Sequence, residues 1–418
     1  MPLAPPARRA LVIGGSLGGL LVGNLLLRAG WDVHVFEQSR EDLVGRGAGI
    51  IPHPELFECL ARIGIPIDES FGVDVPERAV FSRSGEVLGT LAHSQHLTTW
   101  GRLYELLKAA FPASRYHLGH SLSRVERGAG IVAAHFGNGF TAQGELLVGA
   151  DGIRSTLRAQ LLPEARPVYA GYVAWRGLAD ERSLSPAVHR DLFPRFCFSL
   201  AEREQMLGYP VAGFTRSTRY GERCYNFVWY RQADEAGVLP DICTDTHGRR
   251  HEMSVPPQLI RREVVDALRQ AADELLAPQF SEVVRVAQQP FFQAIFDLES
   301  DRIAFGSVAL LGDAAFVARP HCGMGVTKAA GDAMALVSEL AASEHLSEAL
   351  SRYDASRRRF GAAVVARGRE LGAYLQGDEA PGARGHHAAD AVMREIAVAH
   401  EYLPAEYLPA GTAPRGRM

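Results

Sequence analysis

Residues 9–37 decide the fold, and they read RALVIGGSLGGLLVGNLLLRAGWDVHVFE. Ala10 to Ile13 form a short apolar run typical of a buried strand, and a glycine-rich turn ends it. Leu17 to Ala29 carry apolar residues at helical spacing, and Gly30 is typical of the residue that closes a helix. Asp32 to Phe36 read as a second strand. The order predicts a βαβ unit, the beginning of a Rossmann-like domain.

The turn inside this unit predicts a dinucleotide site. Gly14, Ser16 and Gly19 occupy the three key positions of a G-x-G-x-x-G pattern, with serine at the middle one. The helix that follows offers free N–H groups and the positive end of its dipole to a pyrophosphate. Glu37 ends the second strand, where a carboxylate accepts hydrogen bonds from ribose hydroxyls. A glycine-rich turn that binds nothing is the alternative.

The overall composition bounds the class of protein. A length of 418 residues allows two or three domains, and a net charge of −4 gives no electrostatic case for nucleic acid or an anionic membrane. The N-terminus lacks the features of a secretory signal, and no run of 18 apolar residues is present. The five cysteines are widely spaced, without the spacing of a zinc site or a disulfide framework. We therefore expect a cytoplasmic protein with reduced thiols, no membrane partner and no metal.

Two later segments end a strand in the same manner as the first. Residues 146–158, LLVGADGIRSTLR, stop a buried strand at a turn that contains Asp151. Residues 308–331, VALLGDAAFVARPHCGMGVTKAAG, stop another at Gly312-Asp313 and continue through a loop into a helix. Three such strand ends suggest one long cofactor lying across a sheet, which favours FAD. A nicotinamide-dependent dehydrogenase is the alternative, and it leaves the last motif unexplained.

In this order the three motifs resemble those of the single-component (group A) FAD-dependent aromatic monooxygenases, over about residues 8–345. The segments AGYVAWRG (170–177), YNFVWY (225–230) and GDAAFVARPHCGMGVTKAAGDA (312–333) are most similar to the family's hydroxypyridine hydroxylases. The resemblance implies an α/β (α+β) fold in which a Rossmann-like FAD-binding domain carries an inserted, mostly antiparallel β-sheet substrate domain and C-terminal helices. It divides the chain into FAD-binding parts at 1–75, 98–165 and 291–345, substrate-domain parts at 76–97 and 166–290, and C-terminal helices with a tail at 346–418.

The resemblance also gives each motif a role toward FAD. The first loop would hold the pyrophosphate, Glu37 the adenosine ribose, and Asp313 the ribityl chain. Arg102 would lie near the ribose and pyrophosphate; an arginine solvated at a helix start is its alternative. Asp151 would support the pyrophosphate region, and Arg158 its loop. The whole implied set is Gly14, Ser16, Leu17, Gly19, Glu37, Gln38, Arg46, Arg102, Asp151, Asp313, Pro320, Gly323, Gly325 and Val326.

The last loop would face the reactive ring. Residues Pro320 to Gly325 would lie along the isoalloxazine, and the helix from about Val326 would point its N-terminus at the ring edge that becomes anionic on reduction. Glycines at 323 and 325 would let the backbone touch the ring. Arg46 would belong to a mobile loop on the flavin side.

Three side chains are candidates for proton transfer. His321 would stand beside the flavin and take a proton from a substrate hydroxyl near neutral pH; a loop histidine that only packs is the alternative. His53 follows a loop that lines such pockets in the family, and Tyr230 is a candidate phenol donor. In YNFVWY, alternation places Tyr225, Phe227 and Trp229 on one face, and Asn226, Val228 and Tyr230 on the other. One face would pack a core, and one would roof an aromatic substrate.

The implied reaction is ring hydroxylation through a flavin C4a-hydroperoxide. NADH or NADPH would reduce FAD, O₂ would react with it, and an electron-rich hydroxypyridine or phenolic heteroaromatic would be the substrate. A homodimer is expected by family analogy. An epoxidase or ketone oxygenase on the same scaffold and a non-catalytic flavin-binding protein stay open. Helices are predicted at 326–342, 346–373 and 388–400, with a linker at 377–387 and an extended tail from 401.

Overall fold

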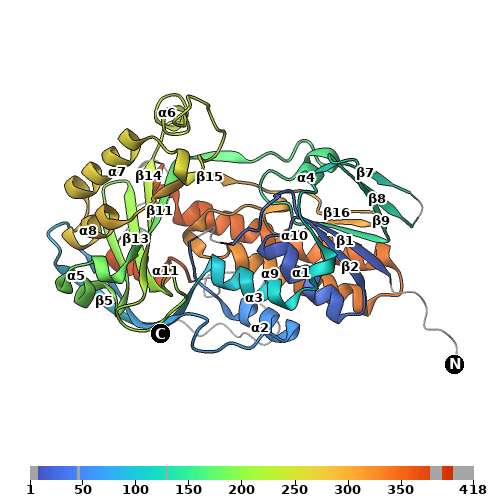
Figure 1. Ribbon diagram of the computed structural model, residues 1–418, viewed down its shortest axis with the longest axis horizontal. Coiled ribbons are helices and arrows are strands. Elements are labelled where there is room, and N and C mark those ends of the chain that lie inside the picture. The colour runs from blue at the N-terminus through green and yellow to red at the C-terminus, as the bar shows by residue number, and fades with distance from the viewer. Residues whose placement is uncertain (1–7, 45–47, 129, 377–387, 399–418) are drawn as a thin grey trace.

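A computed structural model of the protein describes residues 8–44, 48–128, 130–376 and 388–398. Two large sheets lie side by side, and the helices α9 (Gly325–Ala342) and α10 (Leu346–Leu371) run between them (Figure 1). Both helices follow the predicted spans closely. This mixed α/β architecture confirms the predicted fold class.

The first sheet is Rossmann-like, with the strand order β16-β17-β10-β1-β2-β6. Its neighbours pair in parallel, except that β16 is antiparallel to β17. The strands are β1 (Arg9–Ile13), β2 (Asp32–Phe36), β6 (Tyr116–His117), β10 (Leu146–Gly149), β16 (Ala304–Phe305) and β17 (Val308–Leu310). Strands buried on both faces need continuous apolar sequence, which explains the runs LVI and LLV.

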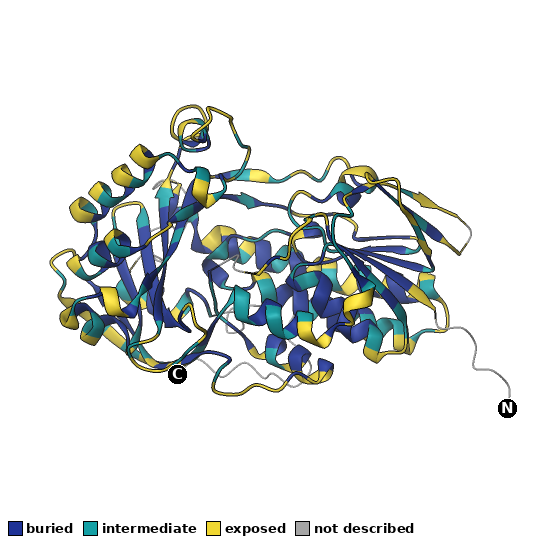
Figure 2. Ribbon diagram, viewed as in Figure 1, coloured by how far each residue is buried: buried dark blue, intermediate teal, exposed yellow. Residues whose placement is uncertain are grey.

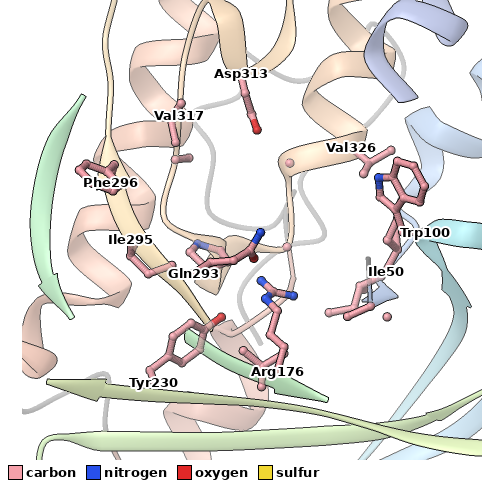
Figure 3. Close-up of a pocket in the computed structure, with 18 of the residues that line it drawn as sticks. Ile50, Trp100, Arg176, Tyr230, Gln293, Ile295, Phe296, Asp313, Val317 and Val326 are labelled. Carbon is pink, nitrogen blue, oxygen red and sulfur yellow. The ribbon is translucent and has the colours of Figure 1, made fainter. Parts of the chain in front are cut away.

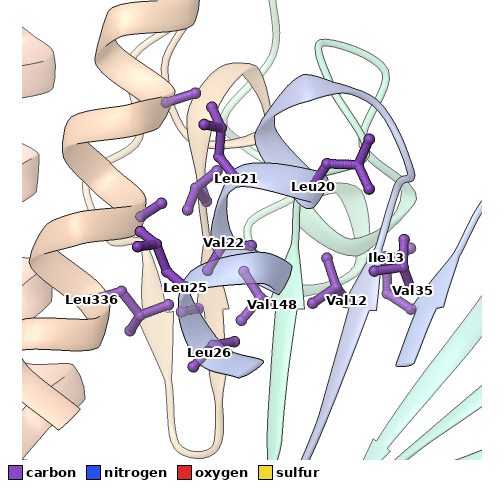
Figure 4. Close-up of a cluster of buried hydrophobic side chains, with 14 of the residues drawn as sticks. Val12, Ile13, Leu20, Leu21, Val22, Leu25, Leu26, Val35, Val148 and Leu336 are labelled. Carbon is purple, nitrogen blue, oxygen red and sulfur yellow. The ribbon is translucent and has the colours of Figure 1, made fainter. Parts of the chain in front are cut away.

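The core of this region forms where α1 (Leu17–Arg28) packs between the sheet and α9. Leu21 and Leu25 of α1, Val12 and Val148 of the sheet, and Leu336 of α9 meet in one cluster (Figure 4). Val12 pairs with Val35 on one side and with Val148 on the other, and all three are fully buried. The predicted βαβ unit is therefore confirmed. Its helix α1 packs against α9, which comes from the C-terminal half of the chain.

The second sheet is larger and mostly antiparallel, with the order β15-β11-β14-β13-β12-β4-β5-β3; β12 and β4 pair in parallel. Its strands are β3 (Gly49–Ile50), β4 (Val73–Phe81), β5 (Val87–Thr99), β11 (Val168–Asp180), β12 (Arg195–Ala201), β13 (Glu204–Val211), β14 (Cys224–Gln232) and β15 (Phe291–Asp297). The sheet reaches beyond the predicted segments 76–97 and 166–290. In particular, β15 pairs with β11 although residues 291–345 were expected in the FAD-binding domain.

The two faces of this sheet pack against different parts of the protein. Tyr225, Phe227 and Trp229 of β14 pack in a core under α5 (Pro186–Leu192), α7 (Arg262–Leu275) and α8 (Pro278–Val286). Val228 and Tyr230 lie on the other face, in a cluster with residues of α10. Figure 2 shows the strands buried and the outer sides of α7 and α8 exposed. The predicted alternation along β14 is confirmed.

Three local features were not predicted as the structure has them. The short helix α5 precedes β12, because Ser185 caps that helix by accepting from Val188 N and Pro186 starts it. A small antiparallel sheet of β7 (Leu122–Arg127), β8 (Val132–Phe136) and β9 (Thr141–Gly144) was not predicted. The helix expected at 388–400 is shorter, α11 (Ala389–Glu395). The predicted linker at 377–387 and the tail from 401 lie outside the described residues.

The remaining helices are α2 (Pro54–Ile63), α3 (Trp100–Ala110), α4 (Thr156–Leu161) and α6 (Val238–Ile242). Within the described ranges, the structure contains no helix long and apolar enough to cross a membrane. All five cysteines are buried with free thiols.

Gly19 tests how closely the first turn packs. A Cβ at this position would lie 1.8 Å from the carbonyl oxygen of Gly14, so backbone would have to move. We expect Gly19→Ala to lower the free energy of unfolding by about 1–3 kcal/mol, the usual cost of overpacking. Urea denaturation measures it.

Gly137→Ala is the matched control. A Cβ there meets only Ser121 O at 3.8 Å, an ordinary contact, and the free energy should change by less than about 0.5 kcal/mol. Equal stability of the two variants would contradict the packing described for the first turn.

Candidate active site

The three glycine turns predicted from the sequence converge at one edge of the first sheet. Their strands β1, β10 and β17 are adjacent and parallel, so their carboxyl ends lie together. Ala150 N donates to Ile13 O at 2.7 Å, and Leu311 N donates to Gly149 O at 2.9 Å. Gly14, with φ +100°, brings its backbone so close to Ala150 that a Cβ would lie 2.3 Å from the Ala150 oxygen. The motifs thus form one continuous surface.

The first loop presents an uncapped helix start and a fixed carboxylate. Ser16 is the N-cap of α1, but its side chain makes no capping hydrogen bond. Glu37 is buried and accepts from Gly15 N and Ser39 N, both at 2.8 Å. Each carboxylate oxygen keeps a lone pair for a ribose hydroxyl. Of the two remaining predicted residues here, Leu17 has its side chain buried in the core, whereas the side chain of Gln38 is exposed.

Two buried polar atoms of the predicted site residues have no hydrogen-bond partner among the described residues. Asp151 accepts from Leu157 N through Oδ2 at 3.2 Å, but its Oδ1 has no partner, and burial raises the pKa of this carboxyl. Arg102 donates from Nη2 to Ser70 Oγ at 2.5 Å, and its Nε is buried without a partner. Such atoms call for an explanation, and the polar middle of a dinucleotide supplies one.

Arg158 joins the second turn to the third. Its guanidinium is buried and donates to Ala314 O at 3.0 Å and to Ala165 O at 3.2 Å. Burial lowers its pKa, an effect that the nearby carboxylates Asp151 and Asp313 oppose. Arg158 therefore connects the loop after β10 to the loop after β17.

A cavity of about 500 Å³ continues from the third turn into the space between the sheets. One wall is the loop from Val317 to Val326, and the opposite wall is the inner face of the second sheet (Figure 3). Six of the predicted site residues line it: Tyr230, Asp313, Pro320, Gly323, Gly325 and Val326. The cavity is large enough for a planar ring system with a smaller ring beside it.

The loop wall fits the edge of a flavin. Asp313 is about half exposed, faces the cavity in Figure 3, and lies 3.4 Å from Lys328 Nζ. The buried Lys328 also donates to Phe316 O at 2.5 Å, which holds the two ends of the loop together. The helix α9 begins at Gly325 without a side-chain cap, and a Cβ at Gly325 would meet nothing within 4 Å. Open space therefore borders the backbone at the positive end of a helix dipole.

The two predicted histidines do not line this cavity. His321 is fully buried, with Nε2 at 2.9 Å from Tyr172 Oη and Nδ1 at 3.3 Å from Gln205 Oε1. Burial lowers the pKa of His321 to about 3, and the Arg319 charge acts in the same direction. The expectation that the loop presents His321 to a substrate is wrong, because the turn Pro320–Cys322 directs the ring beneath the cavity wall.

His53 is also buried, at the start of α2, behind Gly323. Tyr230 is the one member of the predicted catalytic trio that reaches the cavity, and its ring lies against His321 with 4.2 Å between the centroids. Arg46 lies outside the described residues. No cluster of three or more metal-ligating side chains exists in the described part of the chain.

The sequence reasoning missed residues from three places. Arg176 of β11 and Gln293 of β15 extend into the cavity from the second sheet (Figure 3). Ile396 and Ala397 come from the segment after α11. Alternation along residues 170–177 carried a usable signal, because it places Arg176 on the same face as Tyr172. The C-terminal contribution carried none, since the linker before it has no pattern.

The segment after α11 is held against the second sheet. Arg78, fully buried on β4, donates to Met393 O and to Ile396 O, both at 2.8 Å. Ala397 N then donates to His321 O at 2.7 Å. The C-terminal part of the described chain therefore closes one side of the cavity.

Comparison with known proteins agrees with this geometry. A model of the FAD binding domain-like family matches residues 169–297. The chain is 30% identical to 2,6-dihydroxypyridine 3-monooxygenase of Paenarthrobacter nicotinovorans, over 90% of this chain and 93% of the relative. It is 31% identical to 3-amino-4-hydroxybenzoate 2-monooxygenase of Streptomyces cremeus, over 87% and 86%.

Among solved structures, 2,6-dihydroxypyridine-3-hydroxylase from Arthrobacter nicotinovorans superposes with a TM-score of 0.87 at 28% identity, covering 98% of this chain and 100% of that one. Klebsiella pneumoniae HpxO, complexed with FAD and uric acid, shares the fold with a TM-score of 0.75 at 24% identity, over 93% of each chain. The chain belongs to the FAD-dependent aromatic monooxygenases, which confirms the resemblance and excludes the nicotinamide-dependent dehydrogenase.

The buried state of His321 predicts a pH dependence of stability. The folded protein binds a proton at His321 only near pH 3, whereas the unfolded chain binds it near pH 6.5. The unfolded state therefore gains protons first, and stability falls as pH drops below 6.5. By about pH 5 this histidine alone should cost about 2 kcal/mol. We expect His321→Gln to flatten the dependence by that amount in urea unfolding at a fixed FAD concentration.

Tyr172→Phe is the control, because it removes the phenol that meets Nε2 of His321 but keeps the titrating ring. This variant should lose stability at every pH and keep the wild-type slope. Identical slopes for His321→Gln and the wild type would show that His321 is not held neutral by the fold.

Proposed function

We propose that this FAD-dependent monooxygenase hydroxylates an electron-rich hydroxypyridine or a related phenolic ring, with NADH or NADPH as the reductant. The cavity carries this proposal: a backbone wall on one side and an aromatic and polar sheet face on the other enclose a space for a planar ring. The similarity to the dihydroxypyridine enzyme over nearly the whole chain supports the hydroxypyridine class. O₂ is the co-substrate of this reaction class.

The residues at the strand ends fit FAD in two halves. Gly14, Ser16, Gly19, Glu37, Arg102 and Asp151 surround the place for its AMP half, with Leu17 and Gln38 beside them. Asp313, Pro320, Gly323, Gly325 and Val326 border the place for its flavin half. The unpartnered Oδ1 of Asp151 and Nε of Arg102 support this assignment. FAD supplies the chemistry that the side chains lack: it accepts electrons from NAD(P)H and activates O₂.

The protein's own groups bind, orient and exclude water. The start of α9 favours negative charge at the adjoining ring edge. Ile50, Trp100 and Val326 make one side of the cavity apolar, which limits access of water. Burial holds the pKa of Tyr230 above its usual range, so the phenol stays protonated and can donate to an oxygen on the substrate.

The first test is a visible spectrum of the purified protein, followed by NADH and NADPH oxidation under air with and without 2,6-dihydroxypyridine. We expect yellow protein, faster oxidation with the pyridine, and a trihydroxypyridine product. An epoxide or an ester as product would favour the same-scaffold alternatives. Yellow protein that no phenol or heteroaromatic stimulates would favour a non-catalytic flavoprotein. A homodimer and a cytoplasmic location remain predictions, to be checked by light scattering and cell fractionation.

Glu37→Gln tests the AMP half of the site. An amide has one acceptor oxygen, so only one of the N–H groups of Gly15 and Ser39 stays satisfied, and an acceptor for the ribose is lost. We expect the Kd for FAD to rise about 10-fold or more, measured by titrating FAD into deflavinated protein.

Glu58→Gln is its matched control. Glu58 is half exposed on α2 and pairs with Arg62 at 2.6 Å. Surface pairs contribute little, so FAD affinity should not change. An unchanged Kd in Glu37→Gln would remove Glu37 from the proposed site.

A further inference from the structure

Arg176 is the cationic side chain that the second sheet extends into the cavity. It lies on β11, where it pairs with Val228 of β14 on one side and Phe291 of β15 on the other. Its guanidinium points away from the sheet toward the loop wall (Figure 3). Its Nε is buried and has no hydrogen-bond partner among the described residues. A guanidinium has five donors, and leaving such a group partly unpaired is costly unless a ligand completes it.

The charges around the cavity leave Arg176 without an acidic partner in the described part of the chain. The other charged side chains of the lining are Arg154, in the loop before α4, and Asp313. Asp313 lies at the opposite end of the cavity in Figure 3 and pairs with Lys328. The sheet end of the cavity is therefore positive, and an anionic ligand would find an attractive field there.

Two phenols of the protein lie within reach of the Arg176 charge. Tyr230, on the neighbouring strand and the same face, and Tyr209 of β13 both line the cavity. Burial raises the pKa of each, and the Arg176 charge acts in the opposite direction, toward the phenolate. A substrate hydroxyl closer to the guanidinium would feel the same stabilisation more strongly, since the interaction grows as the distance falls.

We infer that Arg176 binds an ionised oxygen of the substrate ring, so that the enzyme selects and stabilises the oxyanion form of a hydroxypyridine or phenol. This inference rests on the proposed function and names the chemical state of its substrate. The guanidinium donates to the ring oxygen, and the protonated Tyr230 is placed as a second donor. The planar guanidinium can donate hydrogen bonds to both in-plane lone pairs of a ring oxygen.

This assignment also replaces the role that His321 cannot fill. A histidine buried outside the cavity does not reach a substrate hydroxyl, and the one carboxylate among the described lining residues, Asp313, pairs with Lys328. With Arg176 present, a base is unnecessary: the ring binds already ionised, and its proton stays with the solvent. The oxyanion then enriches the ring in electrons, which is what an electrophilic oxygen donor requires.

The test measures the binding of ring compounds to the oxidised, FAD-loaded enzyme. The change in flavin absorbance is the signal. The probes are 2,6-dihydroxypyridine and pentafluorophenol, titrated over a pH range that spans the ionisation of each, with phenol as the un-ionised reference. The proteins are the wild type, Arg176→Met and Arg176→Lys. Arg231→Met is the matched control, because Arg231 lies on the same sheet, on the opposite face from Tyr230, and pairs with Glu204 at 2.9 Å.

We expect the wild type to bind the ionised probes more tightly than their neutral forms. Arg176→Met should weaken binding of the ionised form roughly 10- to 100-fold and change phenol binding by less than about 3-fold, whereas Arg176→Lys should be intermediate. Arg231→Met should match the wild type. Bound FAD per protein reports folding in each variant.

Four results would overturn the inference. Wild-type affinity of Arg176→Met for ionised pentafluorophenol would show that the guanidinium does not bind the oxyanion. An equal loss for ionised and neutral probes would assign Arg176 a purely structural role. Failure of every probe to bind the wild type would contradict the substrate class, and the oxidation assay would then show whether the proposed function fails with it. Stimulated NADH oxidation with no preference for the ionised form would remove only the role of Arg176.

Discussion

The structure depends on the adjacency of three parallel strands, β1, β10 and β17, whose carboxyl ends form one edge. They come from distant parts of the chain, and each ends in a turn that must let backbone touch backbone. The contact of Gly14 with Ala150 and the link from Arg158 to Ala314 fix the turns relative to one another. A long cofactor needs that fixed edge, since a shift of one turn would separate its two halves from their partners.

The second sheet faces this edge and forms the opposite wall of the cavity. Because side chains alternate along a strand, β14 gives one face to a hydrophobic core under α8 and the other to the cavity. The core face buries apolar side chains and so stabilises the sheet. The cavity face carries Arg176, Tyr209 and Tyr230. The sheet itself combines strands from both halves of the chain, and Gly49 of β3 donates to Asn226 Oδ1 of β14 at 2.8 Å. The cavity is therefore built from both halves and exists only in the folded whole.

Local patterns predicted most of this architecture. The βαβ unit, the alternation in YNFVWY and the span of α9 follow from spacing and turn residues. The failures have physical causes. Ser185 and Pro186 are the start signals of the short helix α5, which was not predicted. The strand β15 was assigned to the wrong sheet because pairing is not local. The site could be predicted only where backbone binds the ligand. His321 and Arg176 depend on which way a side chain points after long-range pairing, and the loop around His321 gave no sign of its direction.

The positions of His321 and Arg176 are two consequences of one arrangement of charge. Beneath the cavity wall, Arg319 forms a buried ion pair with Asp297 at 2.9 Å and lies over the ring of Tyr172. That guanidinium and the surrounding apolar atoms keep His321 neutral, so the underside of the wall offers no mobile proton. Control of charge on a bound ring must then come from the opposite side, where the second sheet supplies the guanidinium of Arg176. A neutral histidine below and a fixed cation opposite make the cavity a site for an anion rather than for a proton transfer.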